Sequence, residues 1–284
     1  MEIVEGKHNI KIYNNIWAYK LGDLSLNNMG TIDTNRTLGC MSTNQKFYEE
    51  GLTKKEIREK FLQHRKNAAA YEGFQFDPKK FFRPSQTKDG SAVELTKEMV
   101  ESYEDGWDLD IPADILVVTH KTPGVVAGYP VADCPVLIAS DLRNGITATA
   151  HCGAEMIDRE LPRQTIEMMQ NKYNSKLDEI YVYIGSHAGS SWTCDSMPKW
   201  ATNENLWKDS EAIKQREDGS YQIDLRKALL YQFESYNFEP EKFESFLVNN
   251  DDTITNPNYY SNSAARKDPS KAGRQFTGAY YKVR

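Results

Sequence analysis

The segment "VADCPVLIASDLRNGITATAHCGAEM", residues 131–156, consists of two apolar runs joined by a polar turn, and it decides how this part of the chain folds. The runs "PVLIAS" and "ITATAH" flank "DLRNG", in which Asn144 and Gly145 tolerate positive φ angles, so the segment predicts a β-hairpin. If the turn is centred between Leu142 and Arg143, residues whose numbers sum to 285 lie opposite one another.

This register places Cys134 opposite His151. Directly opposed side chains of an antiparallel pair have Cβ atoms about 4.5–5.5 Å apart, which allows a thiol–imidazole contact or a shared metal ion. A bulge at Gly145 would instead bring Cys152 or Ala154 opposite Cys134. Because a lone cysteine on an apolar strand is commonly a packing residue, the hairpin by itself is compatible with a chemical site or with two packed side chains.

The composition is that of an ordinary soluble globular protein. Of 284 residues, 39% are hydrophobic and 27% charged, and the net charge of −6 argues against a nucleic-acid partner. No apolar run approaches the roughly 20 residues that span a bilayer, and the N-terminus lacks a signal-peptide core, so we expect a cytoplasmic protein. Four cysteines without a CxxC pair predict free thiols and no zinc finger.

Helix and strand patterns alternate irregularly along the chain. Helical spacing of apolar residues predicts helices within 53–74, 154–173 and 221–236, with Pro162 opening or kinking the second and Asp224 capping the third. Strand patterns occur within 9–22, 91–96, 113–140, 177–189, 243–250 and the tail 258–284. No linker is visible. We therefore expect an α+β fold, a single domain over residues 1–284 with packed mixed β-sheets and outer helices.

Several segments, in order, resemble motifs of one family. "VADCPVLIASDLRNGITATAHCG" resembles T-A-D-C-x-P-V-L-L … A-H-A-G-W-R-G of the YfiH-type laccase-domain family, also described as multicopper polyphenol oxidoreductase-like or purine nucleoside phosphorylase-like. "THKTPGVVAGYP", "YVYIGSHAGSSW", "QIDLRKALLYQF" and "YYSNSAARKDPSKAGRQFTGAYY" are similar to further motifs, and "RTLGC" and "QHRKNAAAYEGF" to two upstream ones. The resemblance extends from about residue 15 to the end and marks a divergent member.

The resemblance implies a fold related to the catalytic domain of cytotoxic necrotizing factor toxins. It also implies a small centre of two histidines and one cysteine that commonly holds zinc, and activities such as purine nucleoside phosphorolysis and adenosine deamination. The cysteine and one histidine of that centre match Cys134 and His151.

The third member of the centre is missing from its motif. The family takes it from Q-V-H-G, which matches "QTKDG", where Gln86 and Gly90 bracket Lys88 at the histidine position and Asp89 beside it. Asp89 could give a metal an oxygen ligand. Alternatively, the Lys88 ammonium could lower the pKa of the Cys134 thiol and create a metal-free cysteine nucleophile.

Arginines of the family pattern are also lost. Where the family has S-Y-R-R, this chain has Ser-Asn-Ser-Ala at 261–264, while Arg274 is retained and Arg266 could replace one of the lost arginines. Since arginine forks bind phosphate oxygens in pairs, these losses weaken the expectation of phosphorolysis. Two loop prolines of the family pattern are replaced by Ser186 and Ser190.

Two further polar side chains, Asp133 and His187, lie near these motifs. Asp133 precedes Cys134, so strand alternation directs it away from the site and predicts a structural hydrogen-bonding role. His187 lies in a Gly-Ser loop, where a functional position and an exposed surface position are both compatible with the sequence.

Two hypotheses follow from these observations. The first is an enzyme that phosphorolyses, hydrolyses or deaminates a C–N bond of a small nucleoside-like substrate; its only partners would be that substrate and phosphate, with no nucleic acid and no membrane. Its expected catalytic residues are Cys134, His151 and Lys88. If zinc is bound, the expected ligands are Cys134, His151 and Asp89. The expected substrate-binding residues are Gln86, Arg266 and Arg274. Five scattered histidines argue against a copper oxidase. The second hypothesis is a family member without catalysis that serves as a binding or scaffolding protein.

Overall fold

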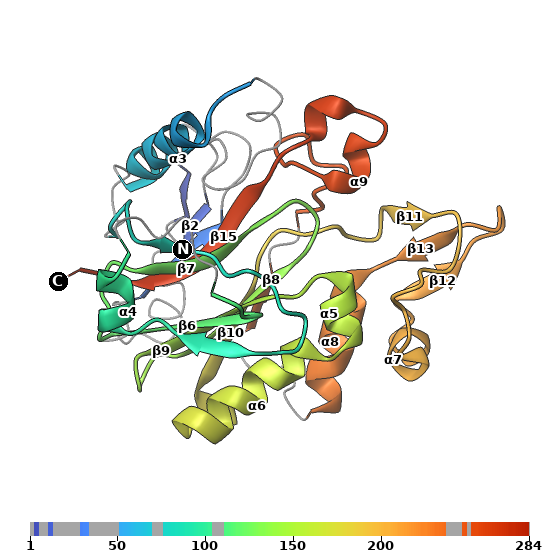
Figure 1. Ribbon diagram of the computed structural model, residues 1–284. Coiled ribbons are helices and arrows are strands. Elements are labelled where there is room, and N and C mark those ends of the chain that lie inside the picture. Colours follow the sequence, from blue (N-terminus) through green and yellow to red (C-terminus); the bar gives the residue numbers. More distant parts are fainter. Residues whose placement is uncertain are drawn as a thin grey trace.

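Two six-stranded sheets form the centre of the structure, a computed structural model in which residues 3–5, 11–13, 29–33, 51–69, 76–103, 111–236, 246–248 and 251–283 are described (Figure 1). The first sheet has the order β1-β2-β3-β15-β7-β4. Its strands are β1 (Ile3–Glu5), β2 (Lys11–Tyr13), β3 (Met29–Asp33), β15 (Gln275–Tyr281), β7 (Val126–Val131) and β4 (Phe81–Phe82). The C-terminal strand β15 thus lies in the middle of the sheet, between β3 and β7.

The second sheet has the order β14-β10-β8-β9-β6-β5. Its strands are β14 (Phe246–Val248), β10 (Ile180–Ile184), β8 (Val136–Asp141), β9 (Ile146–His151), β6 (Ile115–Thr119) and β5 (Ala92–Glu94). Both sheets are mixed, because β4, β5 and β14 each pair in parallel at an edge while the other pairs are antiparallel.

Alternation along the strands builds one core between the sheets and another beneath the helices. In β8, Val136 and Ile138 join the core shared with Tyr129 of the first sheet. Leu137 and Ala139 face the other way and join the core that contacts the helices. The strand therefore reads as a continuous apolar run because both of its faces are buried.

Helices cover the outer faces of the two sheets, which confirms the predicted α+β class (Figure 1). Helices α5 (Ala154–Asp158), α6 (Leu161–Tyr173) and α8 (Leu225–Ser235) lie on the second sheet, and α3 (Lys54–Ala69) lies on the first. Shorter elements are α4 (Lys97–Glu101), α7 (Glu204–Asp209), α9 (Asn262–Ala265), η3 (Leu177–Glu179) and η4 (Pro269–Lys271). A third sheet, with the order β11-β13-β12, extends to one side and comprises β11 (Trp192–Cys194), β13 (Tyr221–Ile223) and β12 (Ile213–Gln215).

The predicted helix boundaries agree with the local chemistry. Pro162 opens a new helix, because α5 ends at Asp158 and Glu160 takes a left-handed φ of 61° before α6 begins. Asp224 caps α8 by accepting a hydrogen bond from the backbone N–H of Lys227 at 3.3 Å. The predicted end of the first helix near Gly73 lies outside the described residues, as does most of the predicted strand region 9–22.

The hairpin is present, but its predicted register is wrong by two residues. Val136, not Cys134, pairs with His151, and Asp141 pairs with Ile146. The Asp141 carboxylate accepts hydrogen bonds from the Asn144 backbone N–H at 2.9 Å and its side-chain amide at 2.7 Å, which closes a four-residue turn. Gly145 completes this turn with a φ of 66°.

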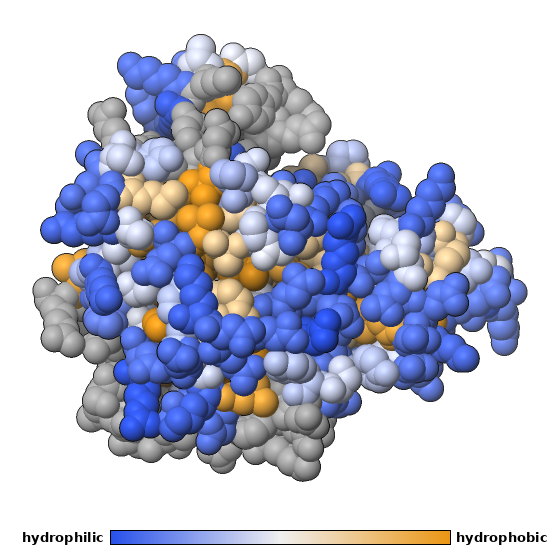
Figure 2. Space-filling view, turned by 60° about the horizontal axis from the view of Figure 1, so that its bottom comes forward, coloured by the Kyte–Doolittle hydropathy of each residue, from blue (hydrophilic) through white to orange (hydrophobic). Residues whose placement is uncertain are grey.

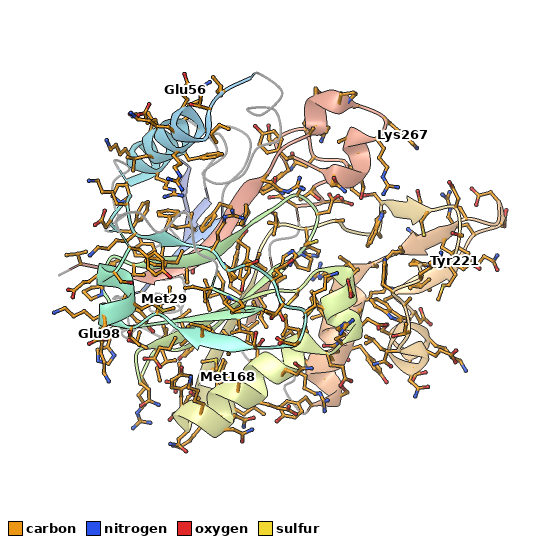
Figure 3. The ribbon with its side chains drawn as sticks, in the orientation of Figure 1. Met29, Glu56, Glu98, Met168, Tyr221 and Lys267 are labelled. Carbon is orange, nitrogen blue, oxygen red and sulfur yellow. The ribbon has the colours of Figure 1, made fainter. Side chains whose placement is uncertain are left out.

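Side chains fill the space between the layers, and the face shown in Figure 2 is mainly hydrophilic with smaller apolar patches (Figures 2 and 3). Met197 and Val283 are the large apolar residues exposed among the described ones. No helix in the described ranges is both long and apolar enough to cross a bilayer.

Candidate active site

Five of the predicted site residues line one pocket of about 370 Å³: Gln86, Cys134, His151, Arg266 and Arg274. They come from five separate places in the chain, the loop before β5, the segment before β8, the end of β9, the end of α9 and the start of β15. Backbone and side chains of 130–133 and residues Ala154, Trp192, Leu225, Asn262 and Ser263 complete the wall. The fold therefore brings these residues to one concave site.

Cys134 and His151 lie near each other at one end of the hairpin, and Gly153 lies beside both of them. Cys134 lies two residues before Val136, the partner of His151, and packs against the same core as Val136, so the thiol is on the same side of the hairpin as the imidazole. A methyl group on Gly153 would lie 3.2 Å from Cys134 Sγ, 3.3 Å from His151 Cε1 and 3.7 Å from His151 Nε2. Gly153 consequently leaves open a small space that the thiol and the imidazole both border.

The loop that carries Gln86 is organised by one buried carboxylate. Asp114 is fully buried and accepts hydrogen bonds from the backbone N–H groups of Lys88 at 3.0 Å, Asp89 at 2.8 Å and Gly90 at 2.9 Å. The Thr87 hydroxyl lies 3.0 Å from the same carboxylate and shares its one hydrogen between Asp114 and Asp89. Such bonds to an ionised acceptor are stronger than neutral ones, so Asp114 fixes the course of this loop.

Gln86 and Tyr129 hold the imidazole of His151. The side-chain amide of Gln86 contacts Nδ1 of His151. The Tyr129 ring stacks on the imidazole with a centroid distance of 5.7 Å and an interplanar angle of 24°, and its hydroxyl donates to the Asp114 backbone carbonyl at 2.7 Å. These contacts fix the ring plane and leave Nε2 on the side of Gly153.

Burial keeps both reactive groups uncharged. It raises the pKa of the Cys134 thiol to about 12, and the neighbouring Asp133 carboxylate adds to this effect. Burial lowers the pKa of His151 to about 4, with the positive charge of Arg274 contributing and Asp114 opposing. Near neutral pH the pair is therefore a thiol and a neutral imidazole.

The two arginines give the pocket a positive charge. Arg274 is half-buried, and one of its nitrogens donates to the Gly273 carbonyl at 2.7 Å. Arg266 is exposed at the end of α9. Within the described part of the chain neither guanidinium pairs with a carboxylate, so both are available to an anionic group of a ligand.

Asp133 has the predicted hydrogen-bonding role, but it lines the pocket, so the prediction that it is directed away from the site is wrong, because it lies between β7 and β8 and strand alternation does not apply to it. One carboxylate oxygen accepts from the Thr253 hydroxyl at 2.8 Å and the other from the Ser263 backbone N–H at 2.7 Å. These two bonds attach the loop before α9, and with it Arg266, to the wall of the pocket.

The structure does not bring Lys88 or Asp89 into the pocket. The Lys88 side chain is 54% exposed and its Nζ pairs with Glu155 Oε2 at 2.6 Å. Asp89 accepts from the Thr87 hydroxyl at 2.7 Å and the Ser91 backbone N–H at 2.9 Å, which lowers its pKa to about 2. Lys88 occupies the position of the histidine in the family motif Q-V-H-G. The side chain of this loop that contacts His151 is Gln86 instead. The physical reason is that Asp114 turns the loop at Lys88, which has a φ of 61°.

The other cysteines and histidines whose side chains the structure describes do not line this pocket. Cys152 is buried in the core beneath the helices, and Cys194 contacts the Ser196 carbonyl. His187 is 3% exposed and its Nδ1 contacts the Gly185 carbonyl at 2.9 Å, so the alternative of an exposed loop position is wrong. His120 is exposed beside the hairpin turn.

Three residues of the site were not identified from the sequence. Tyr129 and Trp192 resemble ordinary core or strand aromatics, and nothing local distinguishes them. Asp114 did carry a signal, because it is a charged residue immediately before the buried run Ile115–Thr119. A buried carboxylate at such a place requires hydrogen-bond donors from another segment.

The side chains of the pocket offer fewer metal ligands than a catalytic metal requires. Cys134 and His151 supply two strong ligands, whereas catalytic zinc normally keeps three. No group of three histidine, cysteine, aspartate or glutamate side chains that could hold a metal occurs among the described residues. The third group beside this pair is the Gln86 amide, a weak ligand for zinc. The described residues thus do not fit a catalytic zinc ion.

Comparison with known proteins gives a family match and a shared fold. The model of the family described as multi-copper polyphenol oxidoreductase laccase matches residues 31–282. Among solved structures, YlmD from Geobacillus stearothermophilus superposes with a TM-score of 0.70 at 18% identity, covering 91% of this chain and 94% of that one. The hypothetical protein YfiH from Bacillus licheniformis gives 0.68 at 18% identity, with coverages of 89% and 93%.

A third structure is similar to the same extent. NMB0706 from Neisseria meningitidis gives a TM-score of 0.62 at 17% identity, covering 90% of this chain and 95% of that one. No protein in the curated set matches the sequence. The likeness to solved structures shows the fold, and the family match covers nearly the whole chain.

Proposed function

We propose that this chain, which belongs to the multi-copper polyphenol oxidoreductase laccase family and is similar in fold to YfiH from Bacillus licheniformis, is an enzyme that cleaves a C–N bond of a small nucleoside-like substrate. The observation that carries the proposal is the convergence of Cys134, His151 and two arginines on one pocket. A volume of about 370 Å³ suits a small organic molecule.

The proposed chemistry uses the side chains of the chain itself, because the donor set does not fit zinc. His151 is neutral near pH 7, so its Nε2 can accept a proton from an attacking water or phosphate. This requires the proton of the neutral ring to be on Nδ1, and the Gln86 amide, whose Nε2 faces Nδ1 in the structure, must turn over so that its oxygen accepts the hydrogen bond from Nδ1–H. Gln86 is then the group that selects the tautomer of the base.

The two arginines of the pocket suit the binding of a phosphate co-substrate. In phosphorolysis, a phosphate oxygen bonds to the carbon of the C–N bond while the electron pair of that bond goes to the leaving nitrogen. Arg274 and Arg266 can bind the phosphate by their planar forks. With water as nucleophile the same arrangement gives hydrolysis, and attack of water on a ring carbon that bears an amino group gives deamination.

Cys134 is assigned as a neutral thiol beside the base. Its raised pKa argues against a preformed thiolate, and Lys88 does not lie in the pocket to stabilise one. The metal-free cysteine-hydrolase alternative would require His151 to remove the thiol proton during attack. Alkylation of Cys134 by a substrate analogue would distinguish that alternative from direct attack by water or phosphate.

A binding protein without catalysis is the second candidate. The high thiol pKa favours it, as does the finding that, among the described residues, Cys134 and His151 have no third strong metal ligand beside them. It predicts that a nucleoside binds without being converted. Binding and turnover must therefore be measured on the same preparation.

The test is an assay of the purified full-length protein with purine nucleosides, with and without inorganic phosphate. Free base formed only with phosphate indicates phosphorolysis, free base without phosphate indicates hydrolysis, and release of ammonia indicates deamination. We expect His151→Ala and Cys134→Ala to lose the activity and His120→Ala, outside the pocket, to keep it. Binding without turnover under all conditions would replace the enzyme with the binding protein. One equivalent of zinc that disappears in Cys134→Ala would overturn the metal-free assignment.

A further inference from the structure

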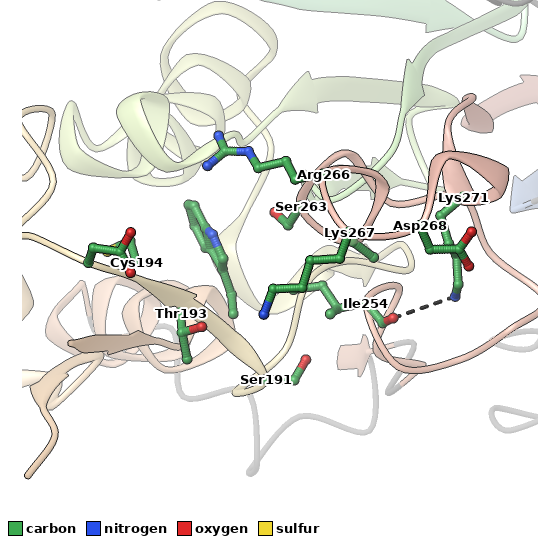
Figure 4. Close-up of a pocket in the computed structure, with 12 residues that line it drawn as sticks. Ser191, Thr193, Cys194, Ile254, Ser263, Arg266, Lys267, Asp268 and Lys271 are labelled. Atoms are coloured by element: carbon green, nitrogen blue, oxygen red, sulfur yellow. Dashed lines mark hydrogen bonds between the residues drawn. The ribbon is translucent and has the colours of Figure 1, made fainter. Parts of the chain in front are cut away.

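A second pocket of about 470 Å³ adjoins the candidate active site (Figure 4). It lies between β11 on one side and the segment of α9 and η4 on the other. Trp192, Ser263 and Arg266 line both pockets. Because the two spaces share these three residues, one ligand can extend from the first into the second.

The second pocket presents two basic side chains to its interior. Arg266 and Lys267 follow α9 directly, and Figure 4 shows Lys267 reaching from that side toward Ser191 and Thr193. In Figure 3, Lys267 projects on the side of the third sheet. Neither Arg266 nor Lys267 pairs with a carboxylate within the described ranges, whereas Lys88, Arg143, Arg159 and other surface cations do.

The other charged side chains that line this pocket do not pair with Arg266 or Lys267. Lys271 Nζ donates to the backbone carbonyl of Asn256 at 2.6 Å. Asp268 accepts from the Ser270 backbone N–H at 3.0 Å and points away from Lys267 in Figure 4. Asp195 is exposed on the opposite wall. Arg266 and Lys267 are thus the cations that face the open space.

The segment that carries these cations is held in position. Ser263 donates its backbone N–H to Asp133 at 2.7 Å, and the Ser261 hydroxyl caps α9 by accepting from the Ala264 N–H at 3.0 Å. Because the backbone of this segment is anchored, binding of an anion has to order only the side chains of Arg266 and Lys267. Hydroxyl groups of Ser263 and Thr193 add hydrogen-bond donors to the pocket.

We propose that this second pocket binds a phosphoryl group attached to the ligand whose other end occupies the candidate active site, so that the substrate is a phosphorylated nucleoside-like molecule. An arginine fork, a lysine ammonium and hydroxyl donors together match the several oxygens and the double charge of a phosphate monoester. The inference rests on the proposed function for the identity of the first-pocket group. It assigns the phosphoryl group to Lys267 and to Arg266, which lines both pockets, and leaves the phosphate of phosphorolysis to Arg274.

The experiment measures binding of a purine nucleoside, its 5′-monophosphate and inorganic phosphate to the full-length protein by calorimetry at low salt. We expect the monophosphate to bind about tenfold more tightly than the nucleoside, since each charge-assisted bond stabilises a complex by at least that factor. Lys267→Gln should remove this advantage and leave the affinity for the nucleoside unchanged, because Lys267 lines only the second pocket. The matched control is Lys97→Gln, since Lys97 is 72% exposed on α4 and lies outside both pockets.

The outcomes separate this inference from the proposed function. Equal affinities for nucleoside and monophosphate, or an advantage that persists in Lys267→Gln, would overturn the second pocket as a phosphoryl site. Inorganic phosphate could instead bind in a Lys267-dependent manner alongside the nucleoside, with no preference for the monophosphate. This result would also overturn the proposal and assign the cations to free phosphate. A Lys267-dependent preference without turnover would support the phosphoryl site while the proposed enzyme fails. The preference should persist in Cys134→Ala, because the thiol lies outside the second pocket.

Discussion

The side-chain amide of Gln86 contacts Nδ1 of His151, although 65 residues separate them in the chain. Gln86 can take this position because the loop that follows it is bound to the buried carboxylate of Asp114. The contact leaves Nε2 of His151 beside Gly153 and Cys134. The geometry of the site thus depends on a residue that does not line the pocket.

Replacement of Asp114 by Asn tests this positioning role. An amide NH₂ facing the backbone N–H groups of Lys88, Asp89 and Gly90 cannot accept all their bonds, so we expect Asp114→Asn to lower the free energy of unfolding by about 3 kcal/mol. Urea unfolding measures this loss. Asp178→Asn, at an exposed position on η3, should unfold like the wild type.

A second measurement separates positioning from stability alone. If Asp114 acts through Gln86, the imidazole ¹⁵N shifts of His151 should change in Asp114→Asn as they do in Gln86→Ala. An unchanged His151 spectrum in a folded Asp114→Asn protein would show that the loop holds Gln86 without this carboxylate.

The sequence predicts those parts of the fold that depend on local patterns. The hairpin, the start of a new helix at Pro162 and the cap at Asp224 all follow from residues within a few positions of the feature. The register of the hairpin does not, because Asp141 closes the turn with its side chain and shifts the pairing by two residues. A one-dimensional pattern does not show which side chain will close a turn.

Family-like motifs predicted several residues of this pocket. Contacts between distant parts of the chain decide the position of the others. Cys134, His151 and Arg274 were identified from family-like motifs and share the pocket. Lys88 was matched to a missing ligand by spacing, but the loop is turned by Asp114, a carboxylate 26 residues away, so Gln86 faces the histidine instead. Contacts at such separations are set by tertiary structure.

The Cys134 thiol is expected to react slowly with iodoacetamide at neutral pH. Burial raises its pKa to about 12, so the thiolate fraction should keep rising with pH beyond pH 10 without reaching a plateau. Peptide-resolved mass spectrometry of the alkylated protein measures the rate at this residue. The same peptide in urea serves as control and should level off near the ordinary thiol pKa. A plateau below pH 8 in the folded protein would indicate a stabilised thiolate and restore the cysteine-nucleophile alternative.

His151 should make the protein less stable in mild acid. Its pKa is about 4 when folded and 6.5 otherwise, so between these values the unfolded chain binds more protons at this residue. Stability therefore falls as the pH is lowered from 6.5 to 4 and is unaffected by this residue above pH 6.5. The full contribution is about 3 kcal/mol, since one pKa unit corresponds to about 1.4 kcal/mol.

Comparison with His151→Gln isolates this contribution. Burial also lowers the pKa of His187, which adds acid sensitivity in the same direction, so the wild type alone does not assign the effect. We expect the difference in unfolding free energy between wild type and variant to shrink as the pH falls from 6.5 to 4. A difference that stays constant over this range would contradict the lowered pKa of His151.

Replacement of Gly153 by Ala tests the space between the thiol and the imidazole. The backbone of Gly153 has a φ of −59°, which alanine adopts without strain, so the variant should fold with a loss of about 1 kcal/mol or less. The added methyl group would lie 3.2 Å from Cys134 Sγ and 3.3 Å from His151 Cε1, closer than ordinary van der Waals contact. It would fill the place where a reacting atom must approach both groups. We therefore expect nucleoside turnover to fall by at least about tenfold, corresponding to 1.4 kcal/mol in the barrier, while thermal unfolding changes little. Full turnover in a folded Gly153→Ala protein would show that the reaction takes place elsewhere in the pocket.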